Sequence, residues 1–299
     1  MLNYSTYTDH GKLKLKELLE LQRHALSKSE QNLQKLLEEY PFLMTGAISG
    51  IDSSYSIFSN LIISQPEIKS FGGDRSPDFL VITWNSLNLF FNFIELEDPS
   101  KKIFRVSDGN LSGDFNEAFN QITEWQAMNT DVRNYCTELL RTLFNGNFNN
   151  NPDKTIHINF ILAFGFSDEV RERGERANNI LQQYFAKPGI FHTTYSRIID
   201  TVRFEYPLFS VKKNVSLGRF EAIGWTPLRN YTTDCWSDFH NILGKEEIVA
   251  KSDMLSNEEK TTLINQIRTM DRKTPAQIRS IIMKDFGHKT FDDLGLEIP

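Results

Sequence analysis

The sequence predicts an α/β protein in which a mixed β-sheet is flanked by helices. Stretches with helical periodicity alternate with short strand-like stretches, in the order helix, three strands, helix, strand, helix, strand. A second observation is the size of the available core, because hydrophobic residues make up 39% of the 299 residues and include 23 Phe. This composition excludes wholesale disorder, and the length allows one large domain or two smaller ones.

The first predicted elements are helical and end at a proline. Residues 13–40 carry leucines at helical spacing, with a second helix beginning near Ser27. Pro41 ends that helix, because proline disfavours helix in the residue before it. Three strands are expected next, of which the second and third are joined by Asn85-Ser86, a spacing typical of a hairpin. These strands are predicted at 57–63, 79–84 and 87–96.

Helices and strands alternate through the middle of the chain, and the pattern weakens beyond Pro207. The middle elements are predicted as a helix at 115–143, a strand at 156–164, a helix at 168–185, a strand at 189–194 and a helix at 195–204. Two helices are expected near the end, at 257–270 and 275–286. Thr274 is the expected N-cap of the last helix, with Pro275 at its first position.

Composition also limits the location and the partners. The formal charge is −6, from 33 Lys plus Arg against 39 Asp plus Glu, so the charge balance alone gives no support to nucleic-acid binding. No apolar run is long enough to cross a bilayer, and no signal peptide is visible. Only two cysteines occur, too few for a disulfide scaffold or a zinc cluster. We therefore expect a soluble, reduced, cytoplasmic protein with no membrane partner.

The acidic excess lies in the first half of the chain. Residues 1–150 hold 13 basic and 19 acidic residues, whereas residues 151–299 hold 20 of each. One interpretation is an acidic surface that serves solubility. The other is that some of these carboxylates converge on a metal ion.

Three acidic residues at two strand ends form the candidate site. Strand side chains alternate between faces, so Glu95 and Glu97 share one face of the third predicted strand. Asp78 stands at the start of the neighbouring strand and can complete an oxygen-only ligand set. Ionised carboxylates that lie close together repel, and a divalent cation removes this cost. Such ligands suit Mg²⁺ or Mn²⁺, which can activate water for phosphodiester cleavage.

The alternative is that Glu95 and Glu97 line the solvated face of a half-exposed strand. The preceding residues weigh against it, because Phe90, Phe91 and Phe93 place aromatic side chains on both faces of the same strand. A strand that is buried on both faces and then presents two acids is typical of a functional site.

The acidic pattern is similar to that of the PD-(D/E)XK nuclease superfamily, with Pro77-Asp78 as its first element and Glu95-Leu96-Glu97 as its second. The wider chain, from about Leu26 to Val202, resembles the nuclease domain of the Shedu family of prokaryotic anti-phage defence proteins. Three further segments carry this resemblance: the helix and proline at 29–41, the helix at 118–125 with Gln121 and Trp125, and the Thr-Tyr-Ser segment that opens 194–199.

This resemblance implies a fold and a reaction. The fold is a restriction-endonuclease-like mixed β-sheet flanked by helices in residues 27–206, preceded by an N-terminal helix in 1–26. A mainly helical accessory region follows in 207–299. The reaction is hydrolysis of DNA phosphodiester bonds with Mg²⁺ or Mn²⁺ during defence against phage, carried out by a homo-oligomer.

The resemblance also assigns roles to individual residues. Asp78 and Glu95 hold the metal, and Glu97 acts as a ligand or as the general base. Glu30 and Gln121 support the site from two helices.

One departure bears on activity. The superfamily pattern has Lys where Glu97 stands, and that Lys positions or deprotonates the attacking water. A tuned carboxylate can act as general base, and Lys101 or Lys102 can swing back to supply the missing charge. The alternative function is a catalytically inactive nuclease-fold module that serves as a DNA-end sensor or an assembly scaffold.

Several of these residues also have a structural interpretation. Ser27 and Glu30 fit a capping box at a helix start, and Gln121 fits a helix surface. Trp125 fits a core position better than a base-stacking platform, and His157 fits a hydrogen-bonded core or rim position better than a ligand role.

Four basic residues are the expected contacts to DNA phosphates. Lys101 and Lys102 follow the acidic strand, and Arg272 and Lys273 lie in the C-terminal helical segment.

Overall fold

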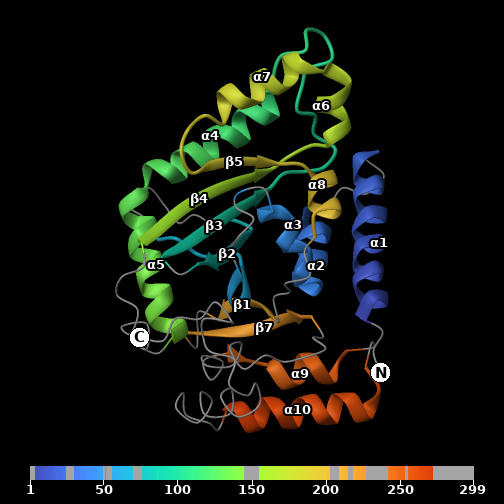
Figure 1. Ribbon diagram of the computed structural model, residues 1–299, viewed down its shortest axis with the longest axis vertical. Helices are drawn as coiled ribbons and strands as arrows, with labels where there is room; N and C mark the ends of the chain where they lie inside the picture. Colours follow the sequence, from blue (N-terminus) through green and yellow to red (C-terminus); the bar gives the residue numbers. More distant parts are fainter. Residues whose placement is uncertain are drawn as a thin grey trace.

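The computed structural model describes residues 4–24, 30–49, 51, 56–69, 76–85, 87–144, 155–202, 209–214, 218–226, 242–252 and 255–271. One large sheet runs through this part of the chain, with helices on both of its faces (Figure 1). The mixed α/β class predicted from the sequence is therefore confirmed. Within the described residues, no helix is long and apolar enough to cross a membrane.

Eight strands form the sheet. They are β1 (Ser56–Ser64), β2 (Phe79–Trp84), β3 (Asn88–Leu96), β4 (Thr155–Ala163), β5 (Ile190–Thr193), β6 (Phe209–Asn214), β7 (Arg219–Trp225) and β8 (Ile242–Leu243). Their order across the sheet is β5-β4-β3-β2-β1-β6-β7-β8. Strand β2 is antiparallel to both β1 and β3, whereas β3, β4 and β5 are parallel to one another. On the other side, β6 is parallel to β1 and antiparallel to β7.

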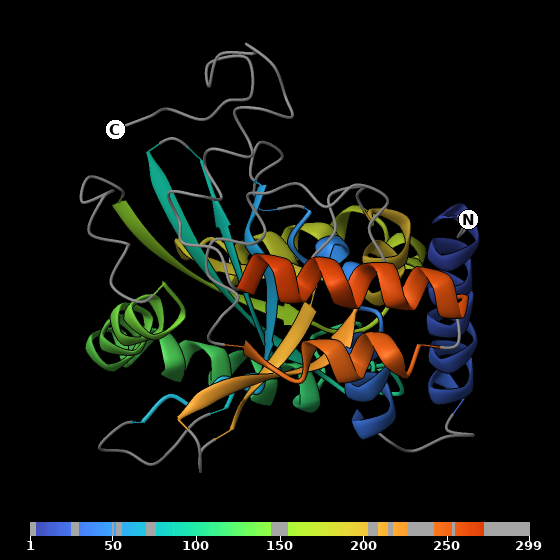
Figure 2. The same cartoon turned by 90° about the horizontal axis from the view of Figure 1, so that it is seen from below.

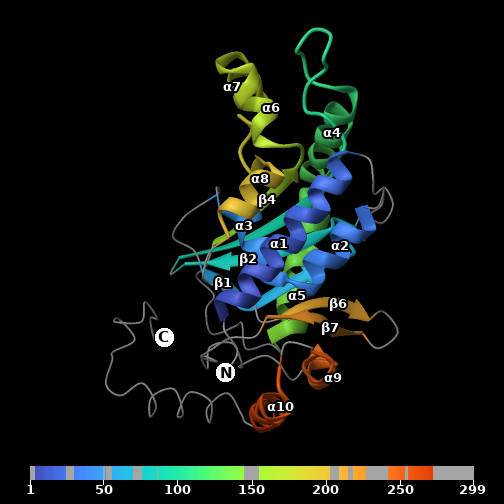
Figure 3. The ribbon, with the colours of Figure 1, turned by 90° about the vertical axis from the view of Figure 1, so that its right-hand side faces the viewer.

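Helices cover both faces of the sheet. They are α1 (Tyr4–Arg23), α2 (Glu30–Glu39), the 3-10 helix η1 (Pro41–Leu43), α3 (Met44–Ile48), α4 (Gly113–Ala127), α5 (Asn129–Phe144), α6 (Ser167–Arg173), α7 (Glu175–Tyr184), α8 (Tyr195–Asp200), α9 (Lys245–Ala250) and α10 (Asn257–Asp271). In Figure 3, α1 and α2 lie in front of the sheet and α5 lies behind it. Figure 2 shows α9 and α10 side by side.

Two hydrophobic clusters fill the space between these layers, one on each face. On β3, Phe91 and Phe93 belong to the cluster under α4 and α5, whereas Ile94 and Leu96 belong to the cluster under α1, α2 and α3. Strand β3 is thus buried on both faces over most of its length, as its aromatic residues predict. Burying a side chain of this size contributes about 1.5 to 3 kcal/mol, so the strand is held firmly where the acidic residues follow.

The β2–β3 hairpin forms as predicted, with pairs running from Phe79 opposite Ile94 to Trp84 opposite Leu89. Its turn is closed by Asn85, whose side-chain oxygen accepts hydrogen bonds from the backbone N–H groups of Leu87 and Asn88. Asn side chains commonly organise turns in this way.

Several predicted helices differ in extent from those observed. Helix α1 begins at Tyr4, earlier than the predicted 13, and the helix predicted at 195–204 ends at Asp200. The helix predicted at 115–143 is two helices separated at Met128. The helix predicted at 168–185 is interrupted at Gly174, which has φ of 67°. A glycine in this conformation stops one helix and lets the chain restart in a new direction.

The region beyond residue 206 adds strands as well as helices. Strands β6, β7 and β8 extend the same sheet, although the weak pattern after Pro207 gave no strand prediction and a mainly helical region was expected. These strands form because of packing, since Phe209 and Val211 of β6 join the core cluster that contains Leu61 and Ile63 of β1. The helix predicted at 257–270 is confirmed as α10, and the one predicted at 275–286 lies outside the described residues.

Strand β7 and helix α2 approach each other very closely. A Cβ atom at Gly224 would overlap the backbone oxygen of Glu38, so only glycine fits there. The Ser210 hydroxyl of β6 donates a hydrogen bond to that same oxygen. Strands β6 and β7 are therefore fastened to helix α2.

Candidate acidic site at the ends of strands β2 and β3

The candidate site lies where β3 ends. Ile94 and Leu96 point into the cluster under α1, α2 and α3, so strand alternation directs Glu95 toward the face covered by α4. Both Glu95 and Glu97 are partly exposed. On the face of β3 that carries Phe91 and Phe93, burial thus stops where the acidic side chains begin.

Asp78 meets Glu95 across the hairpin. Phe79 pairs with Ile94, and continuing this antiparallel register by one position places Asp78 opposite Glu95. Opposed residues of antiparallel strands carry their side chains on the same face. The Asp78 carboxylate also accepts a hydrogen bond of 2.7 Å from the backbone N–H of Leu96. The two carboxylates predicted to act together are therefore neighbours.

Gln121 reaches the same carboxylate from helix α4. Its side-chain nitrogen donates a hydrogen bond of 2.6 Å to Glu95 Oε1. Helix α4 is positioned by the Ser112 N-cap, whose hydroxyl accepts from the backbone N–H of Phe115, and by buried residues such as Ile122. Gln121 is half-buried, and its amide contacts the acidic strand.

Glu97 is paired with a lysine. Lys101 Nζ lies 2.6 Å from Glu97 Oε2, and the Glu97 side chain is 13% exposed against 37% for Lys101. Of the two lysines predicted to swing back, Lys101 does so. Lys102 lies 4.0 Å from Glu169 Oε1 instead. Burial raises the pKa of the Glu169 carboxyl, while the charge of Lys102 acts against that rise.

The Thr-Tyr-Ser segment also touches the acidic strand. The buried hydroxyl of Tyr195 donates a hydrogen bond to the backbone oxygen of Glu97. Thr194 caps helix α8 by accepting from the backbone N–H of Arg197 at 3.3 Å. This helix start therefore fixes the backbone where β3 leaves the sheet.

Sequence reasoning missed two residues behind Asp78. The backbone oxygen of Asp78 accepts from the Gln65 N–H at 2.8 Å and from the Gln34 side chain at 3.2 Å. Gln34 is buried in α2 and also donates to Ser64 at the end of β1. Gln65 has φ of 46°, a conformation that non-glycine residues adopt at a cost and that often marks functional sites. The sequence signal for the Gln34 contact is that Gln34 stands four residues after Glu30. On a helix, this spacing places both side chains on the same face.

Other predicted residues lie elsewhere or outside the described part. Trp125 is buried in the core and His157 is an exposed rim residue that hydrogen-bonds to Asn88, as predicted. Helix α2 begins at Glu30, whose side chain is outside the described residues, as are Ser27 and its capping interaction. Arg272 and Lys273 also lie outside them.

The carboxylates fit a magnesium ion in their chemistry. Within the described residues, no group of three or more His, Cys, Asp or Glu side chains is placed to share a metal ion, and Glu97 faces Lys101 instead. Mg²⁺ commonly keeps several waters and binds through only one or two carboxylates. Asp78 and Glu95 form a donor set of that kind.

Comparison with known proteins identifies the family. A search of curated proteins finds no match. Residues 27–198, more than half of the chain, match the sequence model of the family described as Shedu protein SduA, C-terminal. The matched range includes α2, Asp78, both strand acids, Gln121 and the start of α8. The chain therefore belongs to the Shedu protein SduA C-terminal family, and this membership points to a role in anti-phage defence.

Proposed function

We propose that this chain is a metal-dependent DNA nuclease that hydrolyses phosphodiester bonds in anti-phage defence. The observation that carries the proposal is the placement of Asp78 opposite Glu95 at the ends of paired strands, with Gln121 bonded to Glu95. Two adjacent acids on a rigid hairpin suit an ion that must bind a phosphate and a water. A restriction-endonuclease-like, PD-(D/E)XK interpretation of the sheet is part of the same proposal.

Asp78 and Glu95 would hold the metal ion. A bound Mg²⁺ or Mn²⁺ would lower the pKa of a water and stabilise the charge that develops on the phosphate. The backbone contacts of Asp78 to Leu96, Gln65 and Gln34 hold the first carboxylate in place. The amide of Gln121 holds the second. Such supporting contacts keep ligands in a productive geometry before substrate arrives.

Lys101 takes the role of the lysine that the superfamily pattern has at the position of Glu97. Its ammonium group lies at hydrogen-bond distance from Glu97, so the carboxylate fixes the lysine beside the acidic strand. The side chain of Lys101 is 37% exposed and can therefore contact a phosphate oxygen at the same time. Positive charge placed at a reacting phosphate stabilises the transition state.

Exposed lysines near the same edge of the sheet support DNA as the partner. Strand β6 runs beside β1 with Lys212 opposite Ser64, and both Lys212 and Lys213 are exposed. Lysines that neutralise phosphates supply much of the affinity of a protein for DNA. Lys101 adds a further positive charge at the end of β3.

A homo-oligomer belongs to the proposal as well. Leu13 and Leu21 on α1 are 54% and 47% exposed and would offer apolar contacts to a second copy of the chain. Light scattering of the purified chain would test this part directly, with a monomer as the contradicting result.

The second candidate function is a DNA-binding sensor or assembly scaffold without catalysis. The observation that favours it is the ion pair of Glu97 with Lys101, which leaves two acids instead of three for a metal. This candidate and the nuclease differ in their need for a cation. A scaffold binds DNA equally well in EDTA and cuts nothing.

The test is a cleavage assay on supercoiled, linear and nicked DNA with Mg²⁺, Mn²⁺ or EDTA. We expect cutting with the divalent cations and none in EDTA or in Asp78→Ala. Asp114→Ala, which changes an exposed acid at the start of α4, is the matched control and keeps the activity. Absence of cutting in every condition, with DNA binding retained, would replace the nuclease by the scaffold.

A further inference from the structure

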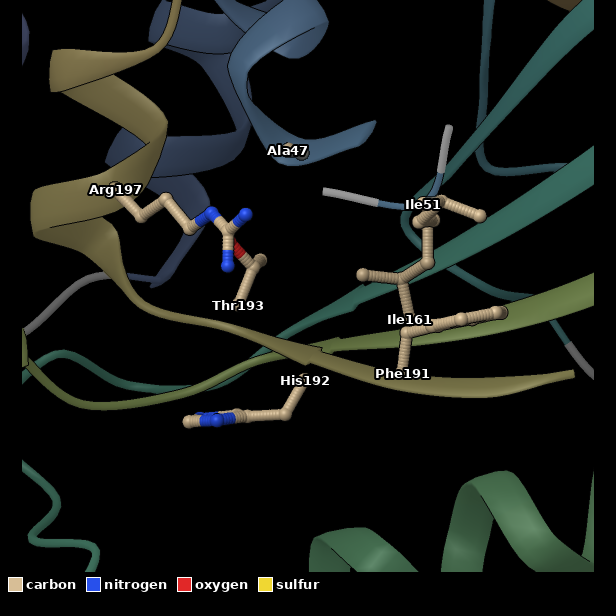
Figure 4. A pocket seen from close by; sticks show the side chains of 7 residues that line it. All are labelled: Ala47, Ile51, Ile161, Phe191, His192, Thr193 and Arg197. Carbon is tan, nitrogen blue, oxygen red and sulfur yellow. The ribbon is translucent and has the colours of Figure 1, made fainter. Parts of the chain in front are cut away.

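A small pocket lies on the face of the sheet opposite Glu95, between helices α3 and α8 and strands β4 and β5 (Figure 4). Its walls are mostly apolar, formed by Ala47, Ile51, Ile161 and Phe191. The polar residues that line it are His192, Thr193 and Arg197, and Figure 4 shows the Thr193 and Arg197 side chains both directed toward the space beneath Ala47. We call this the Arg197 pocket.

The Thr193 hydroxyl is a buried polar group of this pocket. Thr193 is 5% exposed, and within the described residues its Oγ1 atom has no hydrogen-bond partner. Leaving a buried polar group unsatisfied costs stability, so native proteins nearly always provide a partner. Because this hydroxyl lies against the pocket, a ligand bound there would supply the partner that the described residues do not.

Arg197 brings a positive charge to the same place. None of the ion pairs found among the described residues involves Arg197, including any with Asp200 on the same helix. Its guanidinium offers several N–H donors in a planar fork that matches oxyanions such as phosphate. A buried hydroxyl and a guanidinium together are a donor set for an anion.

Among the described residues that line the pocket, Arg197 is the one with a permanently charged side chain. His192 borders it, but Figure 4 shows its ring on the opposite side of β5, where it hydrogen-bonds to the backbone oxygen of Phe164. Burial lowers the pKa of His192 to about 4, so its ring is neutral at pH 7. The positive charge of the site therefore belongs to Arg197.

We propose that the Arg197 pocket binds one phosphate group, held by the Arg197 guanidinium and the Thr193 hydroxyl. The pocket volume of about 30 Å³ has room for about two oxygen-sized atoms, so one or two oxygens of the phosphate enter it and the rest of the group, with any larger ligand, stays outside. The source is inorganic phosphate or the terminal phosphate of a nucleotide. The site is separate from the proposed nuclease centre and does not depend on it.

The test is thermal unfolding of the full chain in increasing inorganic phosphate, against chloride at equal ionic strength. A ligand that binds only the folded state raises the unfolding temperature in a saturable way. We expect this rise with phosphate and not with chloride. A 5′-phosphorylated dinucleotide, compared with its unphosphorylated form, distinguishes the two sources.

Two variants make the test specific. Thr193→Val keeps the shape and removes the unsatisfied hydroxyl, so without phosphate it unfolds at the same or a higher temperature than the parent. Both Thr193→Val and Arg197→Gln should weaken phosphate binding at least tenfold. Arg171→Gln, at an exposed position on α6, is the matched control and binds as the parent does.

Three results would overturn the proposal. The first is no saturable response of the parent to phosphate or to the phosphorylated dinucleotide. The second is an equal response to chloride. The third is an undiminished response in Thr193→Val and Arg197→Gln, which would mean an adventitious ion only.

Discussion

The acidic edge, formed by Asp78, Glu95 and Glu97, and the Arg197 pocket lie on opposite faces of one sheet and offer opposite chemistry. The acidic edge presents carboxylates whose partners are a backbone N–H, an amide and an ammonium group. The pocket presents a guanidinium and a hydroxyl against apolar walls. One region is suited to a cation and the other to an anion.

The two regions also arise in different ways. Asp78 and Glu95 meet because the register of a hairpin dictates it, so residues 17 positions apart become neighbours through local pairing. Arg197 and Thr193 face Ala47 only because α3 and α8 pack together on the sheet. Residues that meet through the register of a hairpin can be identified from the sequence. Residues that meet only because helices pack on a sheet cannot.

The largest effect is expected from Glu95→Gln. The substitution keeps the size of the side chain and an oxygen for Gln121, and it removes only the charge. Cleavage with Mg²⁺ should fall about 10³-fold, the upper range for losing one electrostatic contact in an active site. Initial rates on plasmid DNA measure this, with Glu117→Gln at an exposed position on α4 as the control. A rate within tenfold of the parent would remove the acidic edge from the mechanism.

A smaller loss, about 10²-fold in kcat, is expected from Lys101→Met if the ammonium group assists proton transfer or charge stabilisation. Lys101→Arg keeps the charge and should restore most of the rate. Lys102→Met is the matched control, since Lys102 lies beside Glu169. Equal rates for both methionine variants would show that the Glu97 ion pair is structural.

Gln121→Ala should act on the metal more than on the chemistry. Loss of a contact that orients a ligand typically costs 10- to 100-fold in metal affinity or activity. The Mg²⁺ concentration for half-maximal cleavage should therefore rise by about tenfold or more. Asn120→Ala changes the exposed neighbour and should leave that concentration unchanged. A lower rate at saturating Mg²⁺, with no change in that concentration, would contradict the orienting role.

The smallest effect is expected at an ion pair that belongs to neither region. Partial burial raises the pKa of Asp168, but the hydrogen bond and charge of Arg23 outweigh it, so that pKa lies below its usual value. The pair therefore stabilises the fold at pH above about 4, the ordinary pKa of Asp, and this contribution is lost as the pH falls through the lowered value.

Asp168→Asn should accordingly reduce the free energy of unfolding by up to about 1 kcal/mol at pH 7. Denaturant unfolding at pH 7 and near pH 2 measures the difference, which should vanish at the lower pH. A difference that persists at low pH would mean that packing against Phe166, over which Arg23 lies, carries the effect.

The sequence predicted the first half of the sheet better than the second for a physical reason. Strands β2 and β3 are marked by dense aromatic and β-branched residues, and β2 was predicted at the observed 79–84. Strands β6 and β7 mix buried and exposed residues over short lengths, and their partner β1 lies far away in the sequence. The residues around β6 therefore carry no local sequence signal for its pairing with β1.

The candidate site divides in the same way. Asp78, Glu95, Glu97 and Gln121 were found from spacing and resemblance. The structure places Asp78 opposite Glu95 and bonds Gln121 to Glu95, whereas Glu97 faces Lys101. The hydrogen bonds from Gln34 and Gln65 to the Asp78 backbone oxygen depend on how α2 packs and on the strained backbone of Gln65. A sequence motif records neither of these. The sequence offered Lys101 and Lys102 as sources of the positive charge near Glu97. Which of the two lies beside Glu97 depends on the path of the chain after Pro99, and the structure shows that it is Lys101.

The position of β6 beside β1 limits where this chain can be shortened. The family match ends at residue 198, inside α8, before β6 begins. A fragment cut there would leave β1 with a bare outer edge, where backbone groups at Leu61 to Ser64 now pair with β6. Unpaired strand edges recruit other chains and promote aggregation. The part that matches the family model therefore depends on β6, which follows it, to cover the outer edge of β1.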